Sequence, residues 1–252
     1  MDEATLHYWL TLAQFGLAAV TLAATLLVDA PYGRHIRGGW GPQISAKVGW
    51  IVMESPPVLV FGWIYAQGDH AVELVPLALL ALWQIHYVHR AYIFPFKMRN
   101  AGKQMPLVVA LMAVAFNCLN AYINARWLSQ LGTYEASWLW DPRFIAGAAL
   151  FAFGWRMNRR ADEILFSLRK PGETGYKIPQ GGWYRLVSCP NYLGEIVMWI
   201  GFALAAWSLP AVAFVAYTIA NLAPRALANH RWYHDKFPNY PTERRALIPF
   251  VL

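Results

Sequence analysis

The chain has 252 residues, of which 58% are hydrophobic and only 14% are charged. Soluble globular domains carry about 25% charged residues, so this composition excludes an ordinary soluble protein and predicts an all-α, polytopic membrane protein. The formal net charge is +7, but the basic residues lie between hydrophobic segments, which argues against a nucleic-acid partner. The two cysteines, Cys118 and Cys189, form no CxxC motif, so we expect neither a disulfide framework nor a zinc site.

Seven hydrophobic segments are long enough to cross a bilayer, since a membrane-spanning helix needs about 20 mainly apolar residues. They are residues 8–28, 47–66, 74–94, 106–126, 143–161, 192–208 and 210–228. The sequence SLP at 208–210 predicts a tight turn, with Pro210 opening the last helix. The N-terminal sequence MDEATLHYWL lacks the positive region of a signal peptide, so we expect the first segment to be retained.

The positive residues are distributed unevenly between the two sides of these segments. One side holds 19 of the 21 Lys and Arg residues, and the other holds only Arg126 and Arg143. The positive-inside rule therefore predicts seven transmembrane helices with the N-terminus outside and the C-terminus in the cytosol. We expect residues 1–252 to form a single domain in the plasma membrane of a bacterium or the endoplasmic reticulum of a eukaryote.

Two polar residues are predicted at the same depth in consecutive helices. Glu54 in WIVMESPPVLVF and Tyr87 in WQIHYVHRAYIF each lie about seven residues from the cytosolic end of a segment. An ionised carboxylate inside a membrane helix costs about 3 kcal/mol, so Glu54 is predicted to be functional and uncharged; the alternative is a hydrogen bond that pairs two helices. A neutral acid beside a phenol is suited to hold a carbonyl oxygen that gains negative charge.

Further polar residues collect at the cytosolic ends of the predicted helices and in the loop 159–192. They are Asn158, Asp162, Arg169, Lys170, Asn191, Glu195, Arg225, Asn229 and Tyr233. Singly, each is typical of a capping or snorkelling residue. Together they predict a pocket with cations for phosphates and with amide or carboxyl groups for sugar hydroxyls and a carboxamide. Since no GxGxxG motif follows a strand, a nucleotide would have to bind among helices.

Histidine motifs offer a metal site as an alternative. His86 and His89 form HxxH, and His230 and His234 form HxxxH, which resembles the histidine motifs of membrane di-iron desaturases. Those enzymes use more histidines than these two motifs supply. We therefore expect no metal, with a single metal ion left as a minor alternative.

Four motifs resemble the steroid 5α-reductase family in the same order along the chain. They are MESP, HYVHRAYIFP, the run LRKPGETGYKIPQGGWYRLVSCPNYLGEIVMWIGFALAAWSLP at 168–210, and the terminal YPTERRALIPFVL. The family consists of seven-helix membrane enzymes that use NADPH to reduce the Δ4 double bond of 3-oxo steroids. The resemblance implies an NADPH-dependent 3-oxo-5α-steroid 4-dehydrogenase in which Glu54 and Tyr87 hold the 3-keto oxygen.

The resemblance also implies a division of labour along the chain, with substrate-side helices in about 1–130 and NADPH-binding helices and loops in about 143–252. The implied NADPH contacts are Asn158, Asp162, Arg169, Tyr176, Asn191, Glu195, Arg225, Asn229 and Tyr233, although Asn229 stands where animal members have a histidine. Arg169 is expected at a phosphate, and Asn191 and Glu195 at the nicotinamide. The steroid would lie against Trp50 and Phe116, for which lipid-facing or core packing is an equal alternative. The roles of His86, His89, Arg90, Arg99 and Lys103 stay open.

Two other functions remain as alternatives. The sequence SCPNYLGEIVMWIG is similar to the Pro-x-Tyr-x-Gly start of the cofactor helix in isoprenylcysteine-type membrane methyltransferases. Such an enzyme would bind S-adenosylmethionine and would not need both Glu54 and Tyr87. A non-enzymatic lipid-binding protein would leave the buried carboxyl groups unexplained. We expect a monomer that takes an apolar, steroid-like substrate from the bilayer, with polyprenols and enoyl lipids as other possible acceptors.

Overall fold

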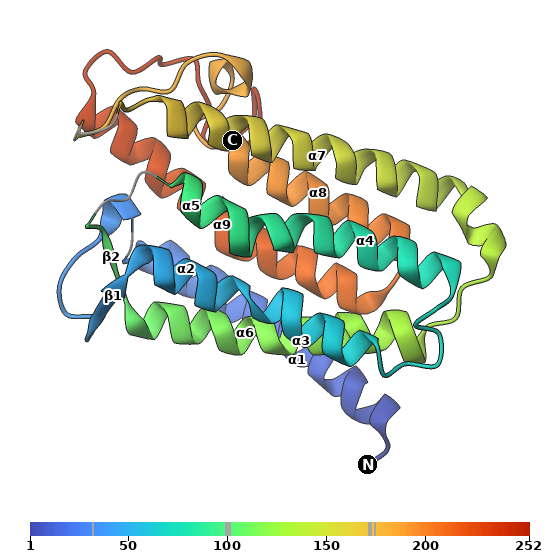
Figure 1. Cartoon of the computed structure of the whole chain (residues 1–252). Coiled ribbons are helices and arrows are strands. Elements are labelled where there is room, and N and C mark those ends of the chain that lie inside the picture. Colours follow the sequence, from blue (N-terminus) through green and yellow to red (C-terminus); the bar gives the residue numbers. More distant parts are fainter. Residues whose placement is uncertain (32, 99–101, 171–172, 174) are drawn as a thin grey trace.

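The structure is a computed structural model that describes residues 1–31, 33–98, 102–170, 173 and 175–252. It is mostly helical, with 72% of residues in helices and 3% in strands, and its long helices run side by side as a bundle (Figure 1). The α-helices are α1 (Glu3–Leu27), α2 (Ala46–Glu54), α3 (Pro56–Tyr65), α4 (Leu74–Val88), α5 (Phe94–Lys97), α6 (Leu107–Arg126), α7 (Pro142–Ser167), α8 (Pro190–Ala206) and α9 (Leu209–Lys236). Arg99, whose role the sequence left open, lies outside the described residues.

Four helices of the described chain are long and apolar enough to cross a membrane. They are Glu3–Leu27, Ala46–Tyr65, Leu107–Leu131 and Leu209–Lys236. The remaining predicted segments are also helical, so the prediction of a helical membrane protein is confirmed at this level.

Several helices differ from their predicted bounds for local reasons. The predicted segment 47–66 is divided into α2 and α3, because Pro56 and Pro57 follow Ser55 and prolines cannot donate the backbone hydrogen bonds of a continuous helix. Helix α4 passes into a π-helical turn, η2 (His89–Ile93), before α5 begins. Helices α7 and α9 extend beyond their apolar parts to Ser167 and Lys236. Pro210 lies in the first turn of α9, as predicted.

Helices α7 and α8 pack closely through facing glycines. A Cβ atom on Gly154 would strike the backbone of Met198 and Gly194, and one on Gly201 would strike the backbone of Phe151. Small residues at a helix interface let two backbones approach closely, as is common in membrane bundles. These contacts bring the backbones of α7 and α8 together along much of α8.

The core of the bundle is aromatic and centres on Trp83 of α4, which is fully buried. Its ring centroid lies 4.5 Å from that of Phe61, 5.2 Å from Trp199 and 5.6 Å from Phe214. Its indole Nε1 donates a hydrogen bond of 2.9 Å to the carbonyl of Pro57. Helices α3, α4, α8 and α9 are thereby joined at one point, and the next turn of α4 is fixed in the wall of a cavity.

Two connections outside the bundle position loops near that cavity. Strands β1 (Gln43–Ser45) and β2 (Gln104–Pro106) pair antiparallel, a short element that the sequence did not predict. After α9 the chain folds back, and the backbone N–H groups of Ser188 and Cys189 donate to the carbonyls of Arg245 and Ala246 at 2.8 and 3.1 Å. The C-terminal segment therefore supports the loop that leads into α8.

Candidate active site

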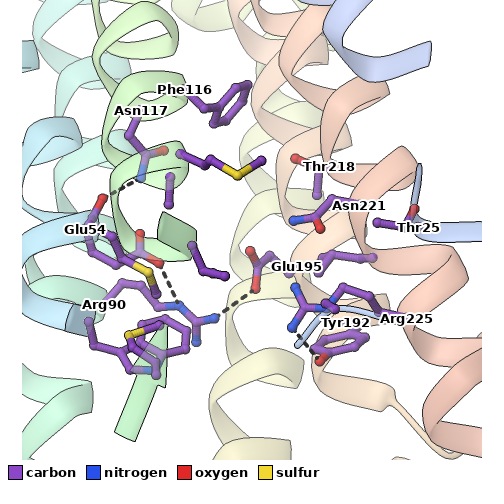
Figure 2. A pocket seen from close by; sticks show the side chains of 18 of the residues that line it. Thr25, Glu54, Arg90, Phe116, Asn117, Tyr192, Glu195, Thr218, Asn221 and Arg225 are labelled. Atoms are coloured by element: carbon purple, nitrogen blue, oxygen red, sulfur yellow. Dashed lines mark hydrogen bonds and ion pairs between the residues drawn. The ribbon is translucent and has the colours of Figure 1, made fainter. Parts of the chain in front are cut away.

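A cavity of about 580 Å³ lies among α1, α2, α4, α6, α7, α8 and α9. Nine of the residues predicted for the site line it: Trp50, Glu54, Tyr87, Phe116, Asp162, Arg169, Asn191, Glu195 and Arg225. Figure 2 shows Glu54 on one wall, Arg225 and Tyr192 on the other, and Glu195 between them. Residues from both halves of the chain thus share one space.

One end of the cavity is apolar. The ring of Phe116 is stacked on that of Tyr217, with 3.5 Å between their centroids, and lies 6.3 Å from Phe214. Val20 of α1 and Met112 of α6 also line the cavity, yet they are 66% and 65% exposed. The apolar end therefore reaches the surface of the bundle near α1 and α6.

The other end is charged, and Arg90 lies at its centre. The Arg90 guanidinium lies 3.9 Å from the Glu54 carboxyl group (Nε to Oε1) and 3.7 Å from each of Asp162 and Glu195. The four side chains are largely buried, with exposed fractions of 7–17%. One cation holds three carboxyl groups that come from three different helices.

Aromatic rings and a backbone irregularity fix Arg90. The Arg90 guanidinium carbon lies 4.5 Å from the ring centroid of Trp50 and 4.5 Å from that of Phe94, within the range of cation–π attraction. Arg90 belongs to η2, and π-helical turns are frequent at functional sites. Trp50, predicted as a substrate contact, thus lines the cavity while it packs on Arg90.

Amide groups connect α7 to α8 beside this centre. The Asn191 side chain donates to Asp162 at 3.3 Å, and the Asn158 side chain donates to the Asn191 carbonyl at 2.9 Å. Asn158 is buried and is absent from the lining of the cavity described above. The structure therefore places Asp162 and Asn191 at the cavity and Asn158 behind them.

A second, smaller cavity of about 220 Å³ adjoins the first and shares Tyr192 and Arg225 with it. It is lined by Arg34, His35, Lys103, Tyr176 and Asn229, among others. Two predicted cofactor residues, Tyr176 and Asn229, are therefore found here. In its wall the Arg225 guanidinium donates to the Tyr192 hydroxyl at 3.1 Å.

Three cations lie near Tyr176, which lines this second cavity. The Arg34, Lys103 and Arg169 head groups lie 5.8, 5.4 and 5.9 Å from its ring centroid. Burial lowers the pKa of the Lys103 ammonium group, and the positive charges of Arg169 and Arg34 lower it further. Such a concentration of positive charge suits a phosphate group. Tyr233, predicted as a cofactor contact, instead lies beside Arg34, 4.6 Å from its guanidinium carbon.

The two histidine motifs do not form one cluster among the described residues. His86 is buried and packs edge-on against Tyr87 and Trp199, with 5.0 Å between centroids in both pairs. His230 lies elsewhere, with its Nδ1 2.6 Å from the Ser188 hydroxyl. Within the described ranges no group of three or more His, Cys, Asp or Glu side chains could hold a metal ion.

Arg34, His35 and Asn221 were not predicted for the site. Arg34 and His35 lie in a loop that has no hydrophobic periodicity, and the positive-inside rule was sufficient to explain its positive charge. Asn221 lies inside an apolar predicted span, and an amide at such a position is the signal that could have identified it.

The fold and the cavity define a class of protein: a helical membrane protein with a large cavity that joins an apolar end to a charged end. The sequence model for 3-oxo-5-alpha-steroid 4-dehydrogenase matches residues 103–252. The steroid 5-alpha-reductase DET2 of Gossypium hirsutum is 42% identical over 255 residues, which cover 99% of this chain and 98% of the relative. The 3-oxo-5-alpha-steroid 4-dehydrogenase 1 of Homo sapiens is 40% identical over 240 residues, 94% of this chain and 92% of the relative.

The chain therefore belongs to the 3-oxo-5-alpha-steroid 4-dehydrogenase family, as its motifs predicted. It is an oxidoreductase, and a reductase of this kind implies a nicotinamide cofactor.

Proposed function

We propose that this protein reduces the Δ4 double bond of 3-oxo steroids with NADPH, and that Glu54 and Tyr87 hold the carbonyl oxygen of the substrate. The observation that carries the proposal is the common cavity. Glu54 from α2 and Tyr87 from α4 line the same space as Asn191 and Glu195 from α8. Family membership supports the reaction, and the cavity supports the assignment of residues.

Glu54 and Tyr87 act as hydrogen-bond donors in this proposal. A buried carboxyl group is favoured in its neutral, protonated form, and a phenol is neutral at physiological pH. Two such donors stabilise the negative charge that develops on an enone oxygen when a nucleophile adds to the β-carbon. The reduced nicotinamide supplies the hydride for that carbon. A proton then reaches the α-carbon as the carbonyl is restored, so the C=C bond gains one hydride and one proton.

The charged end fits the cofactor. Asn191 and Glu195 offer amide and carboxyl groups for a carboxamide, and Asp162 lies beside them. The cations around Tyr176 offer charge for phosphates, and a site with several cations favours NADPH, which carries an additional phosphate, over NADH. Asn158 and Tyr233 would act indirectly, by supporting Asn191 and Arg34.

The apolar end fits the steroid. Phe116 and the surface of the bundle near α1 and α6 offer an apolar route from the bilayer into the cavity. We propose a single domain with seven membrane-spanning segments, an outer N-terminus and a cytosolic C-terminus, in the plasma membrane or the endoplasmic reticulum. We also propose that the protein acts as a monomer.

The proposal is tested with purified protein in detergent, NADPH and either testosterone or progesterone. We expect the 5α-dihydro product by mass spectrometry and matching oxidation of NADPH by absorbance. Reactions with NADH or without a nicotinamide cofactor are the controls. Failure to reduce any 3-oxo-Δ4 steroid would overturn the proposal, and transfer of a methyl group from S-adenosylmethionine would replace it with the methyltransferase alternative.

A further inference from the structure

An amide side chain, Asn221 of α9, projects into the cavity from the wall opposite Glu54 (Figure 2). Asn221 lies one helical turn from Arg225, and Thr218 lies nearly one turn further along the same helix. Among the residues that the structure describes, the Asn221 amide makes no hydrogen bond. Its donor and acceptor are both directed toward the space that a ligand would fill.

Two hydroxyl groups of this wall are already engaged. The Thr218 hydroxyl donates to the Phe214 carbonyl at 2.9 Å. The Thr25 hydroxyl donates to the carbonyls of Thr21 and Ala220 at 2.7 and 3.2 Å. Hydroxyl groups that bond to their own helix backbone have their proton occupied. Asn221 differs from these two residues, because its amide is directed into the cavity and not toward the backbone of its own helix.

Besides these polar groups, apolar and aromatic side chains line the cavity near Asn221. Phe116, Phe214, Tyr217 and Leu222 line the same part of the cavity. A polar group with no partner in an apolar, membrane-embedded site is costly, and such groups often mark a ligand pathway. An amide both donates and accepts, so it can bind a hydroxyl or a carbonyl oxygen.

We propose that Asn221 is a second polar anchor for the substrate and that it binds an oxygen substituent at the end of the steroid opposite the 3-keto group. The inference rests on the proposed function, because Glu54 must hold the first oxygen. A rigid, flat molecule with oxygen at both ends can reach Glu54 and Asn221 on opposite walls. The preferred substrates are therefore 3-oxo-Δ4 steroids with a hydroxyl or carbonyl group on ring D, rather than enones with a single polar end.

Two steroids that differ in one oxygen test this inference. Testosterone has a 17-hydroxyl group, and androst-4-en-3-one lacks it. We expect the wild-type enzyme to prefer testosterone, and Asn221→Leu, which keeps the size of the side chain but not its hydrogen bonds, to lose about fivefold to tenfold in kcat/KM on testosterone, mainly through KM. The same variant should keep its rate on androst-4-en-3-one.

A matched control and a cofactor measurement separate the outcomes. Ile219→Val changes the same helix at a position that is 39% exposed, and it should leave both rates unchanged. Equal losses of Asn221→Leu on both steroids, or weaker NADPH binding with an unchanged steroid preference, would overturn the inference. Equal wild-type rates on both steroids would also overturn it while leaving the proposed function intact. If the wild-type enzyme reduced neither, the proposed function would fail, and the inference with it.

Discussion

The Nε atom of Arg90 lies 3.9 Å from Oε1 of Glu54, so the proposed catalytic acid contacts a cation that also contacts the proposed cofactor residues. The same guanidinium lies 3.7 Å from both Asp162 and Glu195. A single positive charge cannot neutralise three ionised carboxylates, and a buried carboxylate without a counter-ion is strongly unfavourable. Arg90 therefore sets both the positions and the charge balance of the groups around it.

Arg90→Gln should impair catalysis and cofactor binding together. Removal of the guanidinium leaves Asp162 and Glu195 without their cation, and breaking a buried ion pair costs about 3–5 kcal/mol. We expect kcat/KM to fall by at least about tenfold, with weaker NADPH binding and a lower Tm. Steady-state kinetics, cofactor titration and thermal unfolding in detergent measure the three effects.

The control for this change is Arg160→Gln on α7. Arg160 is 73% exposed and pairs with the exposed Glu163, so its loss should change none of the three quantities measurably. Arg90→Lys, which keeps the charge but not the planar fork, should recover part of the loss. If Arg90→Gln behaved like Arg160→Gln, the cluster would have no role in the reaction.

Glu54→Gln and Tyr87→Phe should each lower kcat by about 100-fold, because Glu54→Gln replaces an acidic O–H donor to the developing oxyanion by a far less acidic amide N–H, and Tyr87→Phe removes its donor. NADPH binding should stay within about twofold of wild type, because neither side chain is assigned to the cofactor. The double variant should lose less than the product of the two single effects, since groups that act on one oxygen are not additive. Near-normal turnover in both single variants would remove the catalytic assignment.

The depth of a side chain along its helix could be predicted from the sequence, but the direction in which the side chain points could not. The rise per residue converts a residue count into a depth, which is how Glu54 and Tyr87 were matched, and the structure puts both in one cavity. Arg90 was harder, because it lies in a π-helical turn where the regular angular spacing of an α-helix does not apply. Its contact with three carboxyl groups depends on that local change.

The same limit applies to the cofactor residues. Asn158 and Asp162 are four residues apart on one face of α7, yet only Asp162 reaches the cavity, while Asn158 bonds to a backbone carbonyl. Arg34 comes from a loop. The β1–β2 pairing, which helps to position Lys103, involves only six residues, too few to produce a clear strand pattern in the sequence. Contacts between loops depend on the assembled bundle and leave little trace in periodicity.

Lys103 should make NADPH affinity depend on pH. Its pKa lies below the ordinary value for lysine because of burial and the nearby Arg169 and Arg34. A phosphate favours the charged ammonium, so affinity should be highest below this lowered pKa and should fall as the pH rises through it. Titration of NADPH across the alkaline range, with NADH alongside, measures the effect.

Variants of Lys103 isolate the cause. Lys103→Gln should weaken NADPH several-fold at neutral pH and remove the alkaline decline, because no group is left to titrate at this position. Lys103→Arg should keep affinity and flatten the profile, since arginine stays charged. An unchanged alkaline decline in Lys103→Gln would show that another group controls it, and an equal loss for NADH and NADPH would argue against a phosphate contact.

Gly154→Ala tests whether the close contact of α7 and α8 supports the site. A Cβ atom at this position would meet the backbone of Met198 and Gly194, so the helices must separate slightly. Overpacking of this kind lowers the free energy of unfolding by about 1–3 kcal/mol. Asn158 lies one turn after Gly154 on α7, so the displacement would also move Asn158 away from the Asn191 carbonyl that it binds. We expect a lower Tm in detergent and weaker NADPH binding.

Gly16→Ala in α1 is the matched control, because nothing lies within 4 Å of the Cβ atom that it would add. Alanine is favoured over glycine inside a helix by about 0.5–1 kcal/mol, so Gly16→Ala should leave the Tm unchanged or raise it slightly, with normal NADPH binding. Equal Tm values for Gly154→Ala and Gly16→Ala would mean that the bundle adapts to the added methyl group. A lower Tm with unchanged NADPH affinity would instead separate the stability of the α7–α8 contact from the geometry of the cofactor site.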